Sequence, residues 1–187
     1  MSAMRERYKK AGSVGIPVST GEIKIHEPNE DGIGEVWFRG PNVMLGYYNM
    51  PEETAEVLES DGWLHTGDMG FIDPDGWLYL TGRKKNVIVT NTGENVYPEE
   101  IEDQLNSMPM VSESLVVQRD TRLIALVYPD KDEVVNFSPD ELKAIMEQNL
   151  SELNQRLPHY SRIAEIQLQE EEFAKTPKKS IKRYLYQ

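Results

Sequence analysis

The sequence predicts an α+β protein in which an antiparallel β-rich part, residues 1–83, is followed by a small α+β domain, residues 84–187. Two observations lead to this class. Short runs of alternating polar and apolar residues, separated by turns that contain glycine and proline, fill most of the first part. From about residue 86 onward, strand-like runs alternate with helical runs over roughly 100 residues, which is enough for a small domain.

The first part contains two predicted hairpins. Glu22–His26 alternates polar and apolar residues, and we expect it to pair with the strand-like run Gly34–Gly40. Phe71-Ile72 and Trp77–Leu80 flank Asp73–Gly76, where proline presets φ and glycine accepts a positive φ. That combination predicts a tight turn between two antiparallel strands.

Three helices are expected, each with a proline at its first helical position. The first runs from Pro51 to about Asp61, and the second starts at Pro98. The third starts with a capping box at Ser138–Glu141 and is ended by Pro158. Two apolar stripes support the second and third helices: Ile101, Leu105 and Met108 in one, and Leu142, Ile145, Met146, Leu150, Leu153 and Leu157 in the other.

Strands are expected between these helices. Asn86–Thr90 is strand-like and is closed by a turn at Asn91–Gly93. Glu113–Gln118 and Arg122–Tyr128 are β-rich and are joined by a short connection, and Ala164–Leu168 alternates again.

Composition excludes several classes of function. The chain has 187 residues and a net charge of −12, from 20 Lys and Arg against 32 Asp and Glu, which argues against nucleic acid as a partner. Cysteine is absent, so there is no disulfide framework or thiolate metal site, and a reducing, cytoplasmic location is expected. His26, His65 and His159 are far apart and suggest no metal site.

The N-terminal segment has no apolar core of a signal peptide, and no apolar run approaches the roughly 20 residues of a membrane span. The first 13 residues also lack the periodicity of a strand or helix. We expect the chain to start partway through a larger protein.

Four features have residue types suited to binding a nucleotide, although each one alone favours an ordinary structural role. Asp68, in the Gly-bounded turn Thr66-Gly67-Asp68, could accept hydrogen bonds from a vicinal diol or could cap the local backbone. Arg83 could contact phosphate and Lys85 could act as a swivel, or both could belong to a solvated charge run. Gly93 could let a thin substrate pass or simply form a turn. The cationic tail 175–183 could supply a lysine that stabilises phosphate charge or could be a flexible end.

The order of these features is specific. The sequence contains, in succession, GYYNMPEETAEVL, DGWLHTGDMG, DGWLYLTGRKKNVI, GENVYPEEIE and a Lys-rich tail. From about Gly12 onward it resembles the last third of adenylate-forming ligases, the superfamily of acyl-CoA synthetases, peptide-synthetase adenylation domains and firefly luciferase. The TGENVYPEE variant is most similar to bacterial long-chain fatty-acid CoA ligases.

The resemblance implies an acid–thiol ligase that uses ATP, a fatty acid and CoA in two half-reactions, with an acyl-adenylate between them. It implies that residues 1–83 are the barrel-like β end of a large domain and that residues 84–187 are a small mobile domain. In the family the residue at Asp68 holds the ribose hydroxyls, Arg83 contacts ribose or phosphate, Lys85 is the hinge, and Gly93 lines the CoA path. A parent enzyme of this kind could also associate peripherally with a membrane.

Two departures from the family pattern stand out. The phosphate loop, the adenine segment, most Mg²⁺ ligands and the acyl pocket belong to an upstream domain that is missing here, so we expect the fragment alone to be inactive. The family tail Pro-Lys-Thr-x-x-Gly-Lys, aligned through Lys175-Thr176 and Ile181, puts Ser180 at the lysine position. Either Lys179 substitutes, which is our prediction, or adenylation is weak in the parent.

Two other functions remain open at this point. The chain could belong to an adenylation module that serves a carrier protein, or it could be a non-catalytic interaction domain. Upstream sequence would separate them.

Overall fold

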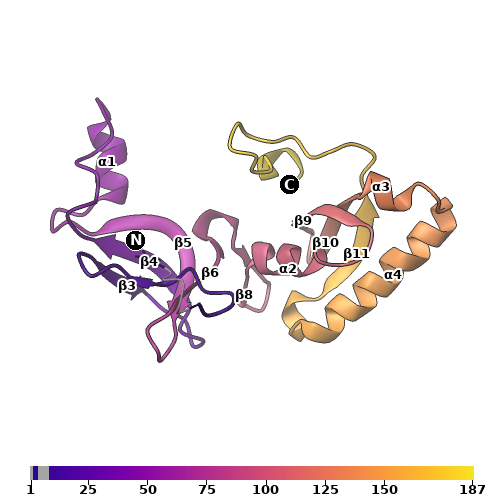
Figure 1. Cartoon of the computed structure of the whole chain (residues 1–187), viewed down its shortest axis with the longest axis horizontal. Helices are drawn as coiled ribbons and strands as arrows, with labels where there is room; N and C mark the ends of the chain where they lie inside the picture. The colour runs from indigo at the N-terminus through magenta and orange to yellow at the C-terminus, as the bar shows by residue number, and fades with distance from the viewer. Residues whose placement is uncertain (1, 4–8) are drawn as a thin grey trace. The chain divides into compact units, whose positions relative to one another are not determined.

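The computed structural model describes residues 2–3 and 9–187 (Figure 1). They divide into two compact units: the first ends at Asn86, and the second runs from Val87 to Gln187. The α+β class with antiparallel strand pairs is confirmed. Among the described residues, no helix is both long and apolar enough to cross a bilayer.

The first unit is built on a four-stranded antiparallel sheet in the order β3-β4-β5-β6. Its strands are β3 (Glu22–His26), β4 (Gly34–Arg39), β5 (Leu64–Ile72) and β6 (Leu78–Arg83). Both predicted hairpins are present. Strands β3 and β6 are the outer strands in this order, and Gly15 is bridged to Leu78 on β6.

Strand β5 begins earlier than predicted and contains Thr66-Gly67-Asp68, which we had expected to be a tight turn. On β4 and β5, Trp37 is paired with His65 and Glu35 with Met69. Between these two pairs, β4 has one residue, Val36, and β5 has three, residues 66–68. Gly67 has a φ of +69°, which a glycine adopts without strain and which lets the extra residues bulge out of a continuous strand. The prediction of a turn was therefore wrong, and the segment is a bulge in the strand.

Two minor elements complete the first unit. Helix α1 (Pro51–Val57) has Pro51 in its first turn and is shorter than predicted, because Leu58 is extended and is bridged to Leu64. Strand β1 (Ser2–Ala3) pairs with β2 (Ile16–Pro17).

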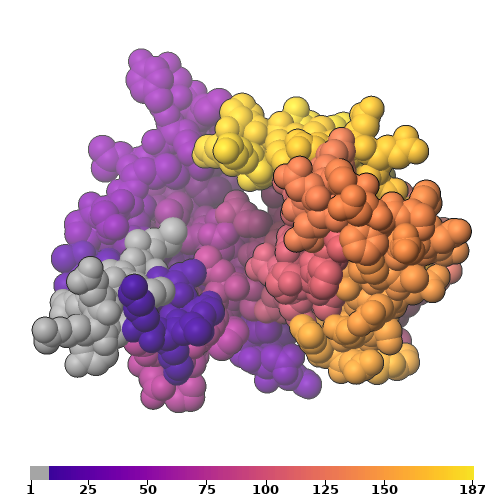
Figure 2. All heavy atoms as spheres, turned by 45° about the vertical axis from the view of Figure 1, so that its right-hand side comes forward, coloured from indigo at the N-terminus to yellow at the C-terminus, as the bar shows by residue number. Residues whose placement is uncertain are grey.

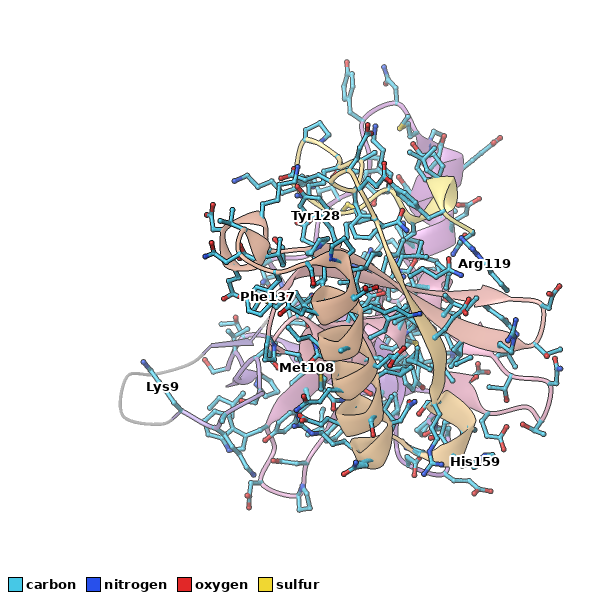
Figure 3. The ribbon with its side chains drawn as sticks, turned by 90° about the vertical axis from the view of Figure 1, so that its right-hand side faces the viewer. Lys9, Met108, Arg119, Tyr128, Phe137 and His159 are labelled. Carbon is cyan, nitrogen blue, oxygen red and sulfur yellow. The ribbon has the colours of Figure 1, made fainter. Side chains whose placement is uncertain are left out.

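The second unit has a three-stranded sheet in the order β11-β10-β9. Strands β9 (Val111–Arg119) and β10 (Arg122–Pro129) form the predicted hairpin, and β11 (Ile163–Leu168) runs parallel to β10. One face packs against α2 (Pro98–Leu105) and α4 (Pro139–Arg156), and α4 crosses in front of the sheet in Figure 3. Both predicted apolar stripes enter this core, although Met108 lies beyond the end of α2.

The ends of α4 follow the sequence signals. The Ser138 hydroxyl accepts a hydrogen bond from the Glu141 amide, and the Glu141 carboxylate accepts one from the Ser138 amide, which is the predicted capping box. The helix stops at Arg156, two residues before Pro158.

Shorter elements connect these parts: the 3₁₀ turns η1 (Lys84–Asn86), η2 (His159–Ser161) and η3 (Arg183–Leu185), strands β7 (Ile88–Val89) and β8 (Asn95–Val96), and helix α3 (Lys131–Val134). The strand expected at Asn86–Thr90 is therefore reduced to β7, because η1 occupies its first residue. The β7–β8 hairpin contains the predicted turn at Gly93.

Candidate functional site

The bulge in β5 positions Asp68 beside the end of β6. Asp68 is the register partner of Arg83, and the Arg83 Nη1 atom lies 2.5 Å from Asp68 Oδ1. The Asp68 side chain is 23% exposed and that of Arg83 is 50% exposed, so the pair is open to a ligand. A diol that binds Asp68 must use its other oxygen or displace the arginine.

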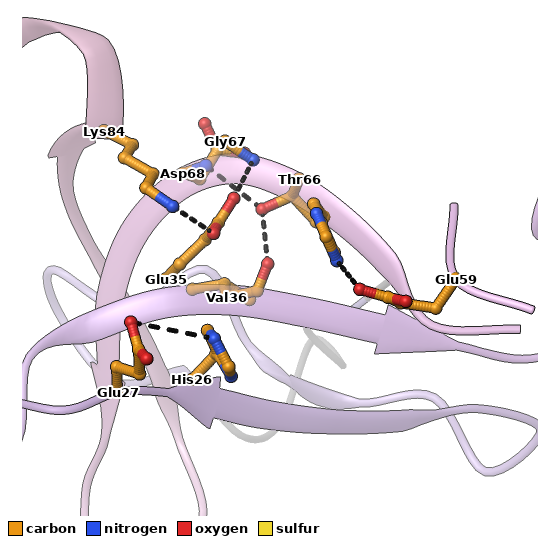
Figure 4. A network of polar contacts seen from close by, with 10 residues as sticks. His26, Glu27, Glu35, Val36, Glu59, Thr66, Gly67, Asp68 and Lys84 are labelled. Carbon is orange, nitrogen blue, oxygen red and sulfur yellow. Dashed lines mark hydrogen bonds and ion pairs between the residues drawn. The ribbon is translucent and has the colours of Figure 1, made fainter. Parts of the chain in front are cut away.

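A buried carboxylate, which the sequence did not reveal as functional, supports this bulge from below. Glu35 on β4 is 6% exposed; it accepts hydrogen bonds from the Gly67 amide (3.1 Å) and the Lys84 ammonium (2.9 Å) (Figure 4). Burial raises the pKa of Glu35, but the hydrogen bond and charge of Lys84 and the Gly67 amide outweigh it and lower the pKa below its usual value. The signal was a glutamate inside the apolar run GEVWF, where an ionised group needs a partner.

Thr66 fixes the other side of the bulge. Its hydroxyl donates to the Val36 carbonyl at 2.6 Å and accepts from the Asp68 amide at 3.1 Å (Figure 4). The bulge is therefore held at Thr66 and at Gly67, and the Asp68 carboxylate projects from a fixed backbone.

A shallow depression of about 250 Å³ adjoins this bulge and is lined by Gly67, Arg83, Lys84 and Lys85. Three of the four lining residues are cationic and exposed, and the fourth contributes backbone without a side chain. A cationic depression next to an aspartate suits a ligand that combines phosphate with hydroxyl groups.

Lys84 and Lys85 differ although they are neighbours. Lys84 is tied to the sheet of the first unit through Glu35, whereas Lys85 is exposed and lies just before the boundary between the units, at Asn86 and Val87. The hinge role of Lys85 remains a prediction.

Gly93 lies at an open turn of the second unit. Its φ is +94°, and a Cβ atom added there would have no neighbour within 4 Å. The adjacent Glu94 carboxylate accepts hydrogen bonds from the hydroxyls of Thr92 and Thr90, which lower its pKa. The turn is thus ordered while the space above Gly93 is free.

The tail forms a small hairpin in which Lys175 is bridged to Ile181. Lys178, Lys179 and Ser180 are exposed at its tip, and the Lys179 backbone has a φ of +62°, a region that favours glycine. In the space-filling view the tail, in yellow, is part of the molecular surface (Figure 2). Ser180 therefore occupies an accessible position, with Lys179 directly beside it.

The first unit thus brings Asp68, Arg83 and Lys85 together, whereas Gly93 and Lys179 belong to the second unit. Within the described residues, no cluster of three histidine, aspartate or glutamate side chains could hold a metal ion.

Comparison with protein families decides the assignment. Residues 85–186 match the model of the AMP-binding enzyme C-terminal domain. This chain belongs to the AMP-binding enzymes.

Curated relatives of this AMP-binding enzyme chain include fatty-acid ligases. It is 45% identical over 104 residues to a chicken (Gallus gallus) long-chain-fatty-acid–CoA ligase ACSBG2, covering 55% of this chain and 14% of the relative. It is 36% identical over 145 residues to the Drosophila melanogaster long-chain-fatty-acid–CoA ligase heimdall, covering 77% and 21%. The chain thus spans about a fifth or less of these proteins.

Solved structures of AMP-binding enzymes share the fold. O-succinylbenzoate CoA synthetase from Bacillus subtilis, in complex with AMP, superposes with a TM-score of 0.75 at 30% identity, over 95% of this chain and 35% of that one. ATP-bound MatB from Rhodopseudomonas palustris gives a TM-score of 0.73 at 28% identity, over 93% and 35%.

Proposed function

We propose that this chain is the C-terminal part of an ATP-dependent, AMP-forming ligase that joins fatty acids to CoA. The single observation that carries the proposal is the Asp68–Arg83 pair beside a cationic depression, in a chain of the AMP-binding family. The long-chain specificity is supported by the names of the relatives. The acyl pocket would belong to the rest of the longer protein.

The chemistry has two steps. A fatty-acid carboxylate oxygen attacks the α-phosphorus of ATP, and pyrophosphate leaves. The sulfur of CoA, having lost its proton, then attacks the acyl carbon of the adenylate, and AMP leaves. Adenylation needs cations near the phosphates, and thioester formation needs space for a thiol, so a movement of the second unit between the steps serves both.

The residues of this chain fit the nucleotide part of that task. Asp68 would bind the ribose hydroxyls and Arg83 the ribose or phosphate, which requires their ion pair to open or to share one oxygen. Mg²⁺ would accompany ATP, and its ligands would come from residues outside this chain. CoA would approach the second unit past Gly93.

The full-length protein should release pyrophosphate with ATP, CoA and a fatty acid of the preferred chain length. An assay across carboxylates from short to long chains checks both the reaction and the specificity. Absence of pyrophosphate release with every fatty acid would refute the proposal.

Asp68→Ala in that protein should raise the KM for ATP by about tenfold or more, because two charge-assisted hydrogen bonds to ribose are lost. Asp61→Ala, at an exposed turn, is the matched control and should leave the KM unchanged. Asp68→Asn separates loss of charge from loss of shape. Equal KM values for Asp68→Ala and Asp61→Ala would contradict the assignment.

Lys85→Pro should uncouple the half-reactions if this residue is the hinge, because proline fixes φ at about −65°. Pyrophosphate release in the adenylation step and thioester formation from supplied acyl-adenylate should then change by different factors. Equal factors for the two steps would argue against a hinge at Lys85.

The 187-residue chain alone should bind ATP weakly, since the proposed site is incomplete without the upstream domain. Isothermal titration calorimetry of the isolated chain tests this. Tight ATP binding would show that the nucleotide site is contained within these residues.

A further inference from the structure

The tail after β11 is packed on the second unit rather than free. Phe173 is 2% exposed against the sheet face opposite α4, and Ile181 and Tyr186 pack on the same cluster. The Phe173 and Tyr186 rings meet edge to face with centroids 5.2 Å apart, and the Ala174 amide donates to the Tyr186 hydroxyl at 2.8 Å.

An ion pair holds the start of the tail hairpin. Lys175 Nζ lies 2.6 Å from Glu113 Oε1 on β9, and the two side chains are 27% and 28% exposed. The hydrogen bond that Lys175 donates to Glu113, more than any other contact, raises the pKa of Lys175, so this lysine already has a structural partner. It is not available to a ligand at the tip.

A more deeply buried ion pair holds the end of the hairpin. Arg183 Nη2 lies 2.6 and 2.5 Å from the two carboxylate oxygens of Glu102 on α2, with side chains 13% and 11% exposed. Glu102 also accepts from the Val116 amide at 2.6 Å, and Arg183 Nη1 donates to the Val116 carbonyl at 3.3 Å. The pair thus occupies backbone groups of edge strand β9 and ties the tail to both α2 and β9.

The segment between these two ion pairs is a closed hairpin. The Thr176 amide donates to the Ser180 carbonyl and the Lys179 amide to the Thr176 carbonyl, each at 2.8 Å. The Lys182 amide donates to the Ala174 carbonyl, also at 2.8 Å. Only the tip, with Lys178 and Lys179, projects into solvent.

We propose that Arg183 and Lys175 are positioning residues that lock the tail hairpin to the second unit, so that the lysines at its tip meet the ATP phosphates as a preformed cationic loop. This proposal rests on the proposed function. Because the normal lysine position holds Ser180, a tip lysine on a loose tail would lose the geometry on which its electrostatic effect depends.

The lock can be tested without any activity, by hydrogen exchange and mass spectrometry on the 187-residue chain. Arg183→Met should speed exchange of peptide 174–182 by about tenfold or more, while α4 keeps its protection. Arg119→Met is the matched control, because Arg119 ends β9 and its side chain donates a hydrogen bond to the Gln167 side chain (3.0 Å), away from the tail hairpin. Unchanged exchange of the peptide in Arg183→Met would overturn the lock.

A second variant keeps the proposal testable if Arg183→Met does not fold. Removing Arg183 leaves the Glu102 carboxylate buried without its cation, which can destabilise the whole unit. Lys175→Met acts at the other, half-exposed end and should also speed exchange of peptide 174–182. If Arg183→Met does not fold, unchanged exchange in Lys175→Met overturns the proposal.

The effect on catalysis is measured in the full-length protein, with the two half-reactions assayed separately. Arg183→Met should lower kcat for pyrophosphate release by about 100-fold. Thioester formation from supplied acyl-adenylate should stay within about twofold, since the tip lysines have no role in that step. Arg183→Lys should fall between wild type and Arg183→Met, because lysine keeps the charge but not the paired hydrogen bonds.

The outcomes are separable. An equal loss in both half-reactions would show that Arg183 only stabilises the fold and would overturn its positioning role. A wild-type protein that releases no pyrophosphate would refute the proposed function, and with it the catalytic part of this proposal. The attachment of the tail hairpin to the second unit would still be tested by the hydrogen-exchange rates of peptide 174–182.

Discussion

At the scale of residues, the candidate site depends on a carboxylate that no ligand would touch. Glu35 is buried beneath the bulge and holds both Gly67 and Lys84. Because its pKa is lowered in the folded chain, the ionised form stabilises the fold above the unfolded pKa, and that contribution is lost as the pH falls through the folded pKa.

Glu35→Gln should therefore reduce stability at pH 7 by about 1–3 kcal/mol, because a buried charge-assisted hydrogen bond is lost. As the pH falls below about 4.5, the variant should also lose less unfolding free energy than wild type, because only wild type has the ionised carboxylate whose contribution is lost there. Denaturant titrations monitored by tryptophan fluorescence at a series of pH values measure both effects. Glu30→Gln, at an exposed position, is the control, and an identical profile for the two variants would contradict the role of Glu35.

Gly70 on β5 lies too close to the neighbouring strand to carry a side chain. A Cβ atom there would lie 2.2 Å from the Tyr79 carbonyl oxygen on the neighbouring strand, so Gly70→Ala should force β5 and β6 apart and cost about 1–3 kcal/mol or more. Gly32→Ala, in open space at a φ of +78°, carries backbone strain alone, about 1–2 kcal/mol. Denaturation midpoints rank the two, and a Gly70→Ala variant more stable than Gly32→Ala would refute this reason for the glycine.

At the scale of elements, α4 is defined by local signals and by the core it covers. The capping box begins the helix, and Met146 and Leu153 bury its inner face against the sheet. Such a helix is specified twice, once by its own ends and once by its packing.

Ser138→Ala should cost about 1 kcal/mol, because the Glu141 amide loses its acceptor. The same change at Ser151, on the exposed side of α4, should be neutral or slightly stabilising, because alanine has the higher helix propensity. Urea denaturation followed by circular dichroism compares them. Equal midpoints would mean that the box does not stabilise the native chain.

The elements also show what the sequence could predict. Alternation and turn residues predicted both hairpins of the first unit and the β9–β10 hairpin, because these are local patterns. The bulge at Thr66–Asp68 was missed, because its geometry depends on Val36 and Glu35 in another strand. The parallel pairing of β11 with β10 was not predicted either, since it is fixed by the packing of α4.

The same distinction applies to the candidate site. The motif order identified Asp68 and Arg83, and the structure pairs them. Glu35 was not identified, because a carboxylate in an apolar strand becomes informative only when Lys84, far along the chain, is known to meet it. The ties of Lys175 and Arg183 were invisible for the same reason.

At the scale of the whole molecule, the two units carry different spectroscopic reporters. The three tryptophans, Trp37, Trp63 and Trp77, all belong to the first unit. The two longest helices, α2 and α4, belong to the second. Tryptophan fluorescence therefore reports on the first unit, and the helical part of the circular dichroism signal comes mainly from the second.

Leu153→Ala should lower the stability of the second unit by about 2–5 kcal/mol, because Leu153 has no exposed surface in that core. The transition seen by circular dichroism should move, while that seen by tryptophan fluorescence stays where it is in wild type. Phe38→Ala in the first unit should give the opposite pattern. Coincident shifts of both signals would show that the units unfold as one.

The tail has one more consequence, for the synthesis of the protein. The sheet face formed by Leu115, Val117, Ile124, Leu126 and Tyr128 is covered by Phe173, Ile181 and Tyr186, which leave the ribosome after every strand of that sheet. Until then that face of the β9–β10 hairpin has no cover. A premature stop codon after β11 would leave that face uncovered permanently and turn the product into a substrate for chaperones and proteases.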